Sequence, residues 1–450
     1  MGIWHVALAL NLVITGLIQA ESGGGSARSD SAFLRWVRAN AIPLPPVDRS
    51  TIDSSFAFLR PLVGSARILA LGELIHGGHE PLEFRNQVIK YAVTQLGFTA
   101  IALETGFTEA AVVDGFIHGG GGNVDSVRHK GLTNNFDSLP ENRELILWLR
   151  SYNAHAVRPV RFYGVDLSGG NDYGDIFDAA PPTVAALDYL QQVNAGAAAQ
   201  LRVGFHTLLG HFNLRRFGEL SPAQRHRLQT ELESLAQTLL ADSSHDTKAS
   251  LRAPYDRVVH DVWMAFRMYE VFDAGVGGAG QFSSAQAELR DSIMAENAKW
   301  ILGQEGEFGR LLLYEHDAHV MNGVSDFTHV HIPGASGLGK WKMAGRHLRG
   351  MFGPNLVIIA TTASATKVLP FWVNGMRGSP SDPASFDAAL ARVGEPRFAL
   401  DLRTADHIPD VAALLERPWP FRTQTFFEPV IVRDAADAIV YFDRVSPSRP

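Results

Sequence analysis

Four ionisable side chains crowd into one short stretch of the chain. Glu73, His76, His79 and Glu80 fall within eight residues, and three glycines accompany them, Gly72, Gly77 and Gly78. Glycine lets a backbone turn sharply and approach a ligand closely. A histidine titrates near neutral pH and can take a proton from water, while a carboxylate orients the imidazole and stabilises its charged form. The stretch predicts acid–base chemistry with His76 as the base, and Glu73 or Glu104 as the orienting group.

The residues on either side predict a strand, a loop and a helix. The apolar run Ile68–Leu71 leads directly into the stretch, and a helical pattern follows from Pro81 to about Leu96. Proline suits the first turn of a helix, and Gly97 supplies a stop. In open α/β sheets, ligands bind at such junctions between a strand and a helix.

An arginine lies in the middle of the apolar stripe of this helix. At 100° per residue, Arg85 falls among the apolar positions and not at their edge. A buried guanidinium needs acceptors, because burying it unpaired is costly. We therefore expect Arg85 to pair with Glu73 or Glu104. The alternative is that its alkyl stem carries the charge to the surface.

The fold class predicted is α/β, with a mainly parallel central sheet flanked by helices. Seven apolar runs read as strands, and most are continuous where a half-exposed strand would alternate, which is typical of strands buried on both faces. They are Ile68–Leu71, Ala100–Leu103, Val160–Val165, Leu311–Tyr314, Leu356–Ala360, Phe398–Leu402 and Ala438–Phe442.

Polar residues follow the first four of these runs. The carboxyl ends of parallel strands meet at one edge of a sheet, so we expect these residues to gather there. They are Glu73, then Glu104, then Asp166, then Glu315, His316 and Asp317 with His319 close behind.

The middle of the chain has a different pattern. Residues 180–272 lack strand-like runs and are rich in Ala, Leu, Gln, Arg and Glu. We interpret them as a helical insertion lobe, which could cap the strand edge, within one α/β domain that spans 31–450.

Composition narrows the partners. The 450 residues carry a net charge of −7, and basic residues form no run, which argues against nucleic acid. The absence of cysteine excludes disulfides, cysteine-bound zinc and a thiol nucleophile. We expect a small-molecule partner and no cofactor; the oligomeric state stays open.

The N-terminus resembles an export signal. Residues 6–20 are nearly all apolar, and 21–30 form a Gly/Ser-rich linker. We predict a signal peptide over 1–20, and hence a periplasmic or secreted protein with no stable membrane insertion. No lysine or arginine precedes the apolar run, so a cytoplasmic protein is the alternative.

Two chemistries are open on the residues alone. In one, a histidine activates water; in the other, histidines and carboxylates hold a metal whose bound water attacks. His-x-x-His occurs at 76/79 and at 316/319, but neither pair has the helical His-Glu-x-x-His form. No Gly-x-Ser-x-Gly elbow follows a strand, so a serine triad is disfavoured. An exported protein that binds a ligand such as haem, without catalysis, is a third hypothesis.

The order and spacing of several motifs resemble the erythromycin esterase family. The similarity extends from about residue 50 to the C-terminus. Its segments are Gly72-Glu73-x-x-His76-Gly77 with Arg85 and Glu104, Phe162–Asp166, Arg290-Asp-Ser-Ile-Met-Ala-Glu-Asn297, Tyr314–Val320, Gly345–Gly353 and Asp437–Pro447.

The resemblance implies metal-independent hydrolysis of the macrolactone ester of erythromycin-type macrolides, and so inactivation of an antibiotic. It assigns the activation of water to His76, and it implies an α/β fold with a helical lobe. The supporting catalytic residues it implies are Glu73, Glu104, Arg85 and a histidine of the 316–319 segment, either His316 or His319. The residues we assign to substrate binding are His79, Asp166, His319 and Asp317.

The chain departs from the family pattern near its second histidine pair. Glu315 replaces a small residue and Asp317 replaces asparagine. We expect these two carboxylates to raise the pKa of His316 and of His319. They also make the expected cleft acidic, which would favour a cationic substrate such as an amino-sugar macrolide.

Overall fold

The computed structural model describes residues 31–46, 55–169, 177–241, 249–278, 282–328, 338–366 and 382–448. The predicted signal peptide and the linker that follows it lie outside these ranges, so export stays a prediction. Within the described residues, no helix combines the length and the apolar character that crossing a membrane requires.

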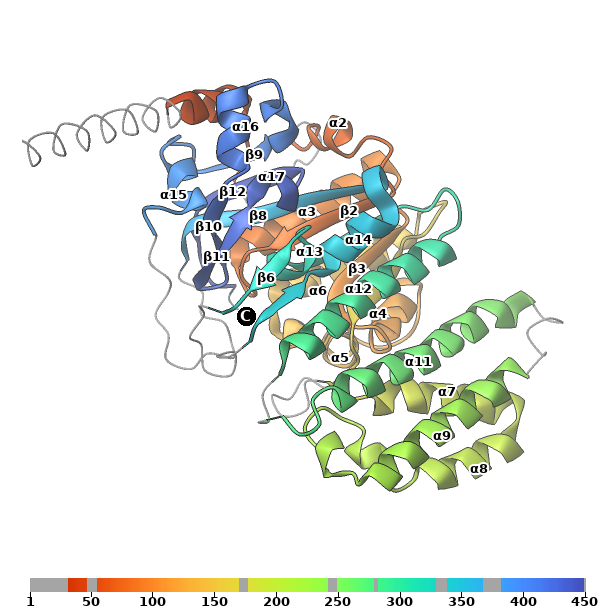
Figure 1. The fold of residues 1–450 in the computed structure, drawn as a ribbon. Helices are drawn as coiled ribbons and strands as arrows, with labels where there is room; N and C mark the ends of the chain where they lie inside the picture. Colours follow the sequence, from red (N-terminus) through yellow and green to blue (C-terminus); the bar gives the residue numbers. More distant parts are fainter. Residues whose placement is uncertain are drawn as a thin grey trace, which may run out of the picture.

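A central eight-stranded sheet organises the molecule (Figure 1). Its order is β1-β9-β12-β8-β2-β5-β3-β4, and the six neighbours from β12 to β4 run parallel. The strands are β1 (Ile42–Pro43), β2 (Ile68–Glu73), β3 (Ala100–Gly106), β4 (Arg161–Asp166), β5 (Leu311–His316), β8 (Leu356–Thr366), β9 (Arg397–Asp401) and β12 (Ala438–Val445). This confirms the mainly parallel sheet predicted from the continuous apolar runs. The exceptions are β9 and β1, which pair antiparallel at one edge.

Helices cover both faces of the sheet, as the burial of its strands requires. Alternate residues of β2 enter two separate apolar cores, Leu69 and Leu71 on one face and Ile68 and Ala70 on the other. The first face is covered by α3 (His79–Leu96), α4 (Ala110–Ile117), α5 (Val124–Gly131) and α6 (Pro140–Asn153). The second is covered by a helix over 31–40 and by α12 (Ser284–Gln304), α14 (Ala344–Phe352), α15 (Phe386–Ala391), α16 (Pro409–Leu415) and α17 (Val432–Ala435).

Short elements complete the sheet domain. Two small antiparallel pairs are β6 (Val324–Asp326) with β7 (Lys340–Lys342), and β10 (Pro418–Thr423) with β11 (Phe426–Ile431). The short helices are α2 (Leu59–Val63), α13 (Asp317–Val320) and the 3₁₀ turn η1 (Phe136–Ser138).

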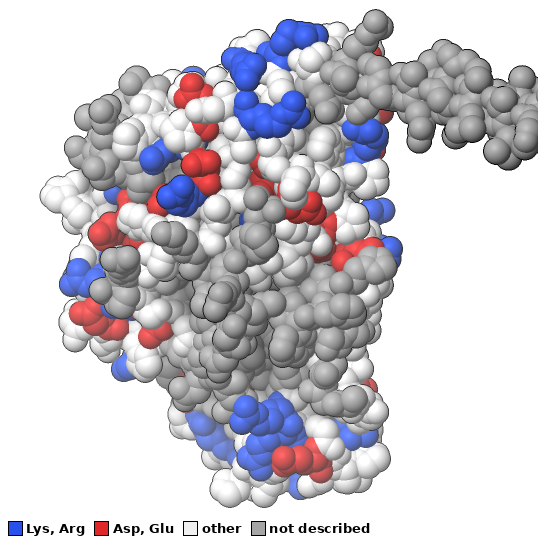
Figure 2. Space-filling view, turned by 90° about the vertical axis from the view of Figure 1, so that its left-hand side faces the viewer, with Lys and Arg blue, Asp and Glu red and all other residues white. Residues whose placement is uncertain are grey.

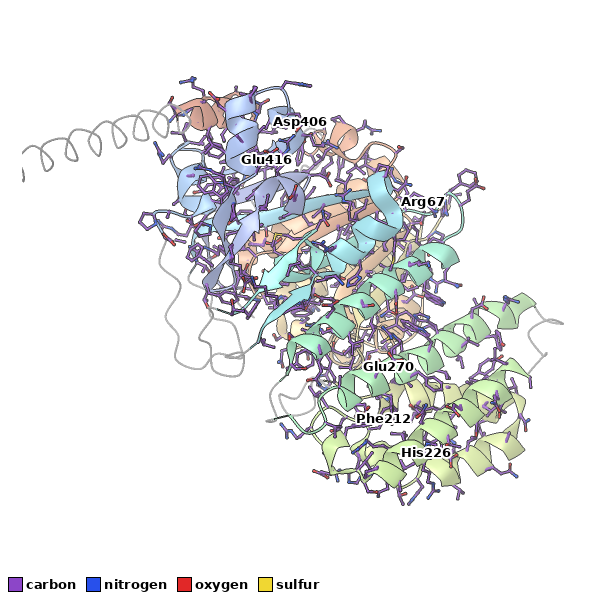
Figure 3. All side chains as sticks on the ribbon, viewed as in Figure 1. Arg67, Phe212, His226, Glu270, Asp406 and Glu416 are labelled. Atoms are coloured by element: carbon purple, nitrogen blue, oxygen red, sulfur yellow. The ribbon has the colours of Figure 1, made fainter. Side chains whose placement is uncertain are left out.

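Residues 180–272 contribute helices that pack around a core of their own. They are α7 (Ala180–Val193), α8 (Ala195–Phe205), α9 (Pro222–Leu240) and α11 (Ala249–Asp273). Phe212, labelled in Figure 3, lies among them and meets the rings of Phe217 and Phe272. We call these helices the helical lobe. Its α11 contacts the sheet domain, where Thr108, just after β3, donates to Asp261 at 2.7 Å.

The surface mixes charges of both signs. On the face in Figure 2, acidic and basic side chains are interspersed, and basic side chains gather at the lower end, over the helical lobe. The mixture accords with the modest net charge of −7.

Candidate active site

The strand order brings the predicted residues to one edge of the sheet. β5 lies between β2 and β3, and Glu73 is the register partner of His316. Glu104 stands near the end of β3, and Asp166 ends β4. Because these strands are parallel neighbours, polar residues far apart in the sequence meet at their carboxyl ends.

His76 and Glu73 form a buried, hydrogen-bonded pair in this cluster. The Nδ1 atom of His76 lies 2.7 Å from Glu73 Oε2, and both side chains are buried. The carboxylate fixes the proton on Nδ1, so the lone pair resides on Nε2, which lies 3.8 Å from Glu104 Oε1. Burial lowers the pKa of His76, but the carboxylates of Glu104 and Glu73 outweigh burial and raise that pKa above 6.5.

Rings on two sides hold the imidazole in place. The centroid of the Phe136 ring lies 5.1 Å away, in an edge-on contact, and that of His316 lies 5.0 Å away. Phe136 comes from η1, so the wall around His76 combines the sheet edge with the segment before α6. This packing leaves His76 little freedom to rotate away from Glu73.

Glu104 is the hub of the cluster. Its Oε2 accepts the backbone N–H of His316 at 2.7 Å, and its Oε1 accepts from Arg290 Nη2 at 3.0 Å. His319 Nε2 lies 3.5 Å from the same oxygen. Burial would raise the pKa of Glu104, but His319, His76 and Arg290 hold it well below its usual range. Glu104 is therefore ionised despite its burial.

Arg290 is a member of the site that our residue-by-residue reading missed. It lies on α12 and donates two hydrogen bonds to Asp166, Nε to Oδ1 at 2.8 Å and Nη2 to Oδ2 at 2.6 Å. The next residue, Asp291, contacts His319 Nδ1 and accepts from the indole of Trp341 at 3.0 Å. The signal was present, because Arg290 and Asp291 open one of the motifs that carried the family resemblance.

Asp166 is fully buried and anchors Arg290. His319 also belongs to this network, since Nδ1 faces Asp291 and Nε2 accepts from Arg290 Nη1 at 3.1 Å. The assignment of both residues to substrate binding stays a prediction.

His316 is held by backbone groups on both sides of its ring. Its Nδ1 accepts the N–H of Ala318 at 3.1 Å, and its Nε2 donates to the carbonyl of Leu74 at 3.2 Å. These bonds fix the neutral ring, and burial together with nearby His76 lowers its pKa well below the usual range. The predicted rise in the pKa of His316 is therefore wrong.

The reason lies in the two acidic residues that flank it. Burial raises the pKa of Glu315 and of Asp317 well above the usual range, which favours their neutral forms. The pKa of His319 is raised, but the carboxylate that overcomes burial there is Asp291.

Asp317 does not join the site, in contrast to our assignment to substrate binding. It is fully buried and accepts hydrogen bonds from Thr361 N and Oγ1. It also lies against Gly72, where a Cβ atom would come within 1.8 Å of Asp317 Oδ1. Gly72 is therefore required for the close approach of α13 to β2.

Arg85 is buried as predicted, with 1% of its surface exposed, but its partners differ. Nε and Nη2 donate to Asn86 Oδ1 at 3.1 and 2.8 Å, and the guanidinium stacks 4.9 Å from the centroid of Tyr314. No ion pair joins Arg85 to Glu73 or Glu104 among the described residues. The side-chain oxygen of Asn86 and the ring face of Tyr314 stabilise the buried guanidinium in place of the expected carboxylate.

His79 lies apart from His76, at a wider opening. Its Nδ1 is 2.7 Å from Glu141 Oε1, and 43% of its side chain is exposed. It borders a cleft of about 350 Å³ that is also lined by Glu83, Glu144 and Pro447.

The C-terminal residues bind the segment that runs from the His76 loop into the first turn of α3, where His79 lies. Ser446 O accepts from His79 N at 2.9 Å, and the N–H of Ser446 donates to Glu80 at 2.7 Å. Ser448 N donates to Gly77 O at 2.8 Å. The last residues of the described chain thus brace the loop that holds His76.

The cluster is organised around a guanidinium. Within the described ranges, no group of three or more His, Asp or Glu side chains is arranged to hold a metal ion. The carboxylates of Glu104 and Asp166 point at Arg290 instead. What remains is a histidine whose Nδ1 proton is fixed by a carboxylate, an arrangement that can take a proton from water.

Comparisons with known proteins identify the family of this chain. The erythromycin esterase family matches residues 93–445. The chain is 24% identical over 304 residues to erythromycin esterase type II of Escherichia coli, covering 64% of this chain and 68% of that one. It is 23% identical over 289 residues to the type I enzyme of the same organism, covering 61% and 67%.

Solved structures share the fold. A protein from Bacillus cereus superposes with a TM-score of 0.74 at 22% identity, covering 93% of this chain and 98% of that one. A succinoglycan biosynthesis protein gives 0.74 at 19% identity, with the same coverage. An erythromycin esterase mutant in its open conformation gives 0.64 at 18% identity, covering 91% and 98%.

Proposed function

The chain belongs to the erythromycin esterase family, and from that premise we propose that it hydrolyses a carboxylic ester with water activated by His76. The observation that carries this proposal is the buried bond between His76 Nδ1 and Glu73 Oε2 at 2.7 Å. It fixes the imidazole as a base at Nε2, and it gives the imidazolium that forms a partner of opposite charge.

The reaction follows from this geometry. His76 Nε2 takes a proton from water, and the water oxygen attacks the ester carbonyl carbon. The tetrahedral intermediate collapses by breaking the bond to the alcohol oxygen, and His76 returns its proton to that oxygen. The products are a carboxylic acid and an alcohol, which for a lactone remain in one opened molecule.

Positive charge near the reacting carbonyl stabilises the intermediate. We assign this role to Arg85, which lines one cavity together with Glu73 and Glu104, and to Arg290, which pairs with Glu104 at 3.0 Å. His316, fixed in its neutral form, positions the Leu74 carbonyl and the wall of the site without exchanging protons.

We propose a macrolide lactone as the substrate. Two observations support it: the family to which the chain belongs, and the cleft of about 350 Å³ beside His79. Glu83, Glu141 and Glu144 line that cleft, which suits a substrate that carries a protonated amino sugar.

Mass spectrometry tests the proposal. The purified protein is incubated with erythromycin in ¹⁸O-labelled water, and the product is expected to gain one water with the label in the new carboxylate. An unlabelled or dehydrated product contradicts hydrolysis. Unchanged erythromycin alongside turnover of simple esters keeps the esterase and rejects the macrolide.

A further inference from the structure

A small cavity behind Glu73 collects buried polar atoms that lack partners. It has a volume of about 10 Å³, and Glu73, Arg85, Asn142 and Tyr314 contribute to its lining. Considering all described residues, Glu73 Oε1, Asn142 Oδ1 and Tyr314 Oη are shielded from solvent and make no hydrogen bond of good geometry, although Glu73 lies close enough to the Tyr314 hydroxyl to raise its pKa. Buried polar atoms are nearly always paired, so three such atoms around one cavity call for an explanation.

We propose that this cavity binds one water molecule, which links Tyr314 and Asn142 to Glu73 and makes them positioning residues for the His76–Glu73 pair. The site itself follows from the cavity and its lining; its role in turnover rests on the proposed function. A cavity of about 10–15 Å³ is just large enough for one water, and a buried water makes about three hydrogen bonds.

The hydrogen-bonding capacities of the three atoms match one water. Glu73 Oε1 and Asn142 Oδ1 are acceptors, so the water donates one proton to each of them. The hydroxyl of Tyr314 donates to the water oxygen. The three atoms thereby find the partners that they lack in the protein.

Other contacts hold each group in place around the cavity. Glu73 uses Oε2 for His76 at 2.7 Å, which directs Oε1 to the other side. The amide of Asn142 donates to Phe136 O at 2.8 Å, and Arg85 stacks on the Tyr314 ring. The water site therefore connects α6, β5 and β2 beneath the catalytic pair.

This water would hold the catalytic carboxylate in place. Its hydrogen bond to Glu73 Oε1 fixes the orientation of the carboxylate, so that Oε2 stays aligned with His76 Nδ1 and balances the imidazolium that forms during the reaction. Tyr314, which is 4% exposed, acts through Glu73 and has no direct route to substrate.

Removing one hydroxyl tests this role. For Tyr314→Phe, we expect kcat for ester hydrolysis to fall about tenfold with KM unchanged. The acidic limb of kcat/KM should move to lower pH, because a carboxylate that is less well aligned with His76 raises the pKa of that imidazole less. The matched control is Tyr163→Phe, a buried tyrosine of β4 whose hydroxyl bonds to Glu305 at 3.1 Å. Wild-type kcat and pH profile in Tyr314→Phe, or equal losses in both variants, overturn the proposal.

A high-resolution crystal structure of the wild-type protein tests the site independently of any substrate. The expected result is density for one water within hydrogen-bonding distance of Glu73 Oε1, Asn142 Oδ1 and Tyr314 Oη. An empty cavity, or a Tyr314 hydroxyl that bonds Glu73 directly, overturns the water site. A protein that hydrolyses no ester but shows this density would reject the proposed function and leave the water site intact.

Discussion

Two buried carboxylates near the end of β3 have pKa values that are shifted in opposite directions. Glu104 is 4% exposed and Asp261, on α11 of the helical lobe, is 2% exposed. The pKa of Glu104 is held well below its usual range, whereas the pKa of Asp261 rises from 3.8 to about 6. Burial is common to both, so it cannot decide the charge.

The groups around each carboxylate decide whether it is ionised. Glu104 faces His319, His76 and Arg290, which lower its pKa, while Asp261 accepts from the hydroxyl of Thr108 and lies near Arg257, and burial still raises its pKa. His260, next to Asp261, accordingly has a pKa of about 3, since burial between Trp263 and Trp300 disfavours its charge. Glu104 at the sheet edge keeps its charge because cations surround it, whereas burial favours the neutral forms of Asp261 and His260 at the lobe junction.

Replacing Arg290 should have the largest effect on stability of the changes considered. Arg290→Leu leaves Glu104 and Asp166 buried without their shared cation, so we expect a loss of roughly 3–5 kcal/mol in the free energy of unfolding. Urea denaturation measures it.

The control for that variant is a surface pair of similar form. Arg433 bonds Asp406 at 2.9 Å and Glu416 at 2.6 Å, and both acids, labelled in Figure 3, are about half exposed. Arg433→Leu should cost about 1 kcal/mol or less. Equal losses in the two variants would mean that Arg290 has no special role.

At the lobe junction, removing a buried charged group should raise the stability of the protein, the opposite of the effect expected for Arg290→Leu. The folded state binds the proton of Asp261 more tightly than the unfolded state does, so stability falls as pH rises from about 4 to about 6. Asp261→Asn should therefore stabilise the protein at pH 8 by roughly 2–3 kcal/mol and have little effect below pH 4. Denaturant titrations at both pH values decide it, and a destabilised variant at pH 8 would contradict the assigned environment.

The pH dependence of turnover tests whether carboxylates at the sheet edge raise the pKa of His76. His76 acts as a base only when neutral, and its pKa lies above 6.5, so kcat/KM should fall as pH drops through a value above 6.5. Glu73→Gln removes one carboxylate that raises this pKa, so the acidic limb of the residual activity should move to lower pH. An unshifted limb would show that Glu73 does not act on His76.

Chelation should have the smallest effect. The carboxylates of Glu104 and Asp166 pair with the guanidinium of Arg290, where a metalloenzyme would place a metal ion. Prolonged EDTA treatment should therefore leave ester turnover unchanged. Loss of activity that returns with added Zn²⁺ would favour the metal-dependent mechanism that the residues alone left open.

Local and periodic features of the sequence predicted the fold and part of the site. The apolar runs gave the seven strands, because strands buried on both faces admit few polar residues. Glu73 and His76 stand three residues apart at a strand end, so their meeting is nearly a local property. The burial of Arg85 followed from its place on the helical stripe.

Partners that converge in space were harder to predict. Asn86 satisfies Arg85 from the adjacent position, which helical periodicity gives no reason to expect. Arg290 reaches Asp166 across 124 residues, and its role depends on how α12 crosses the sheet. The neutral state of His316 depends on two backbone groups, Leu74 O and Ala318 N, whose positions only the folded chain defines.

The most direct test of the central claim compares two histidines. His76→Ala and His226→Ala are assayed on the ester that the wild-type protein hydrolyses, with folding checked by circular dichroism. His226 lies on the exposed surface of the helical lobe and is labelled in Figure 3. The account predicts that a folded His76→Ala loses turnover by about a hundredfold or more, while His226→Ala keeps it. A folded His76→Ala protein with wild-type turnover would contradict the account.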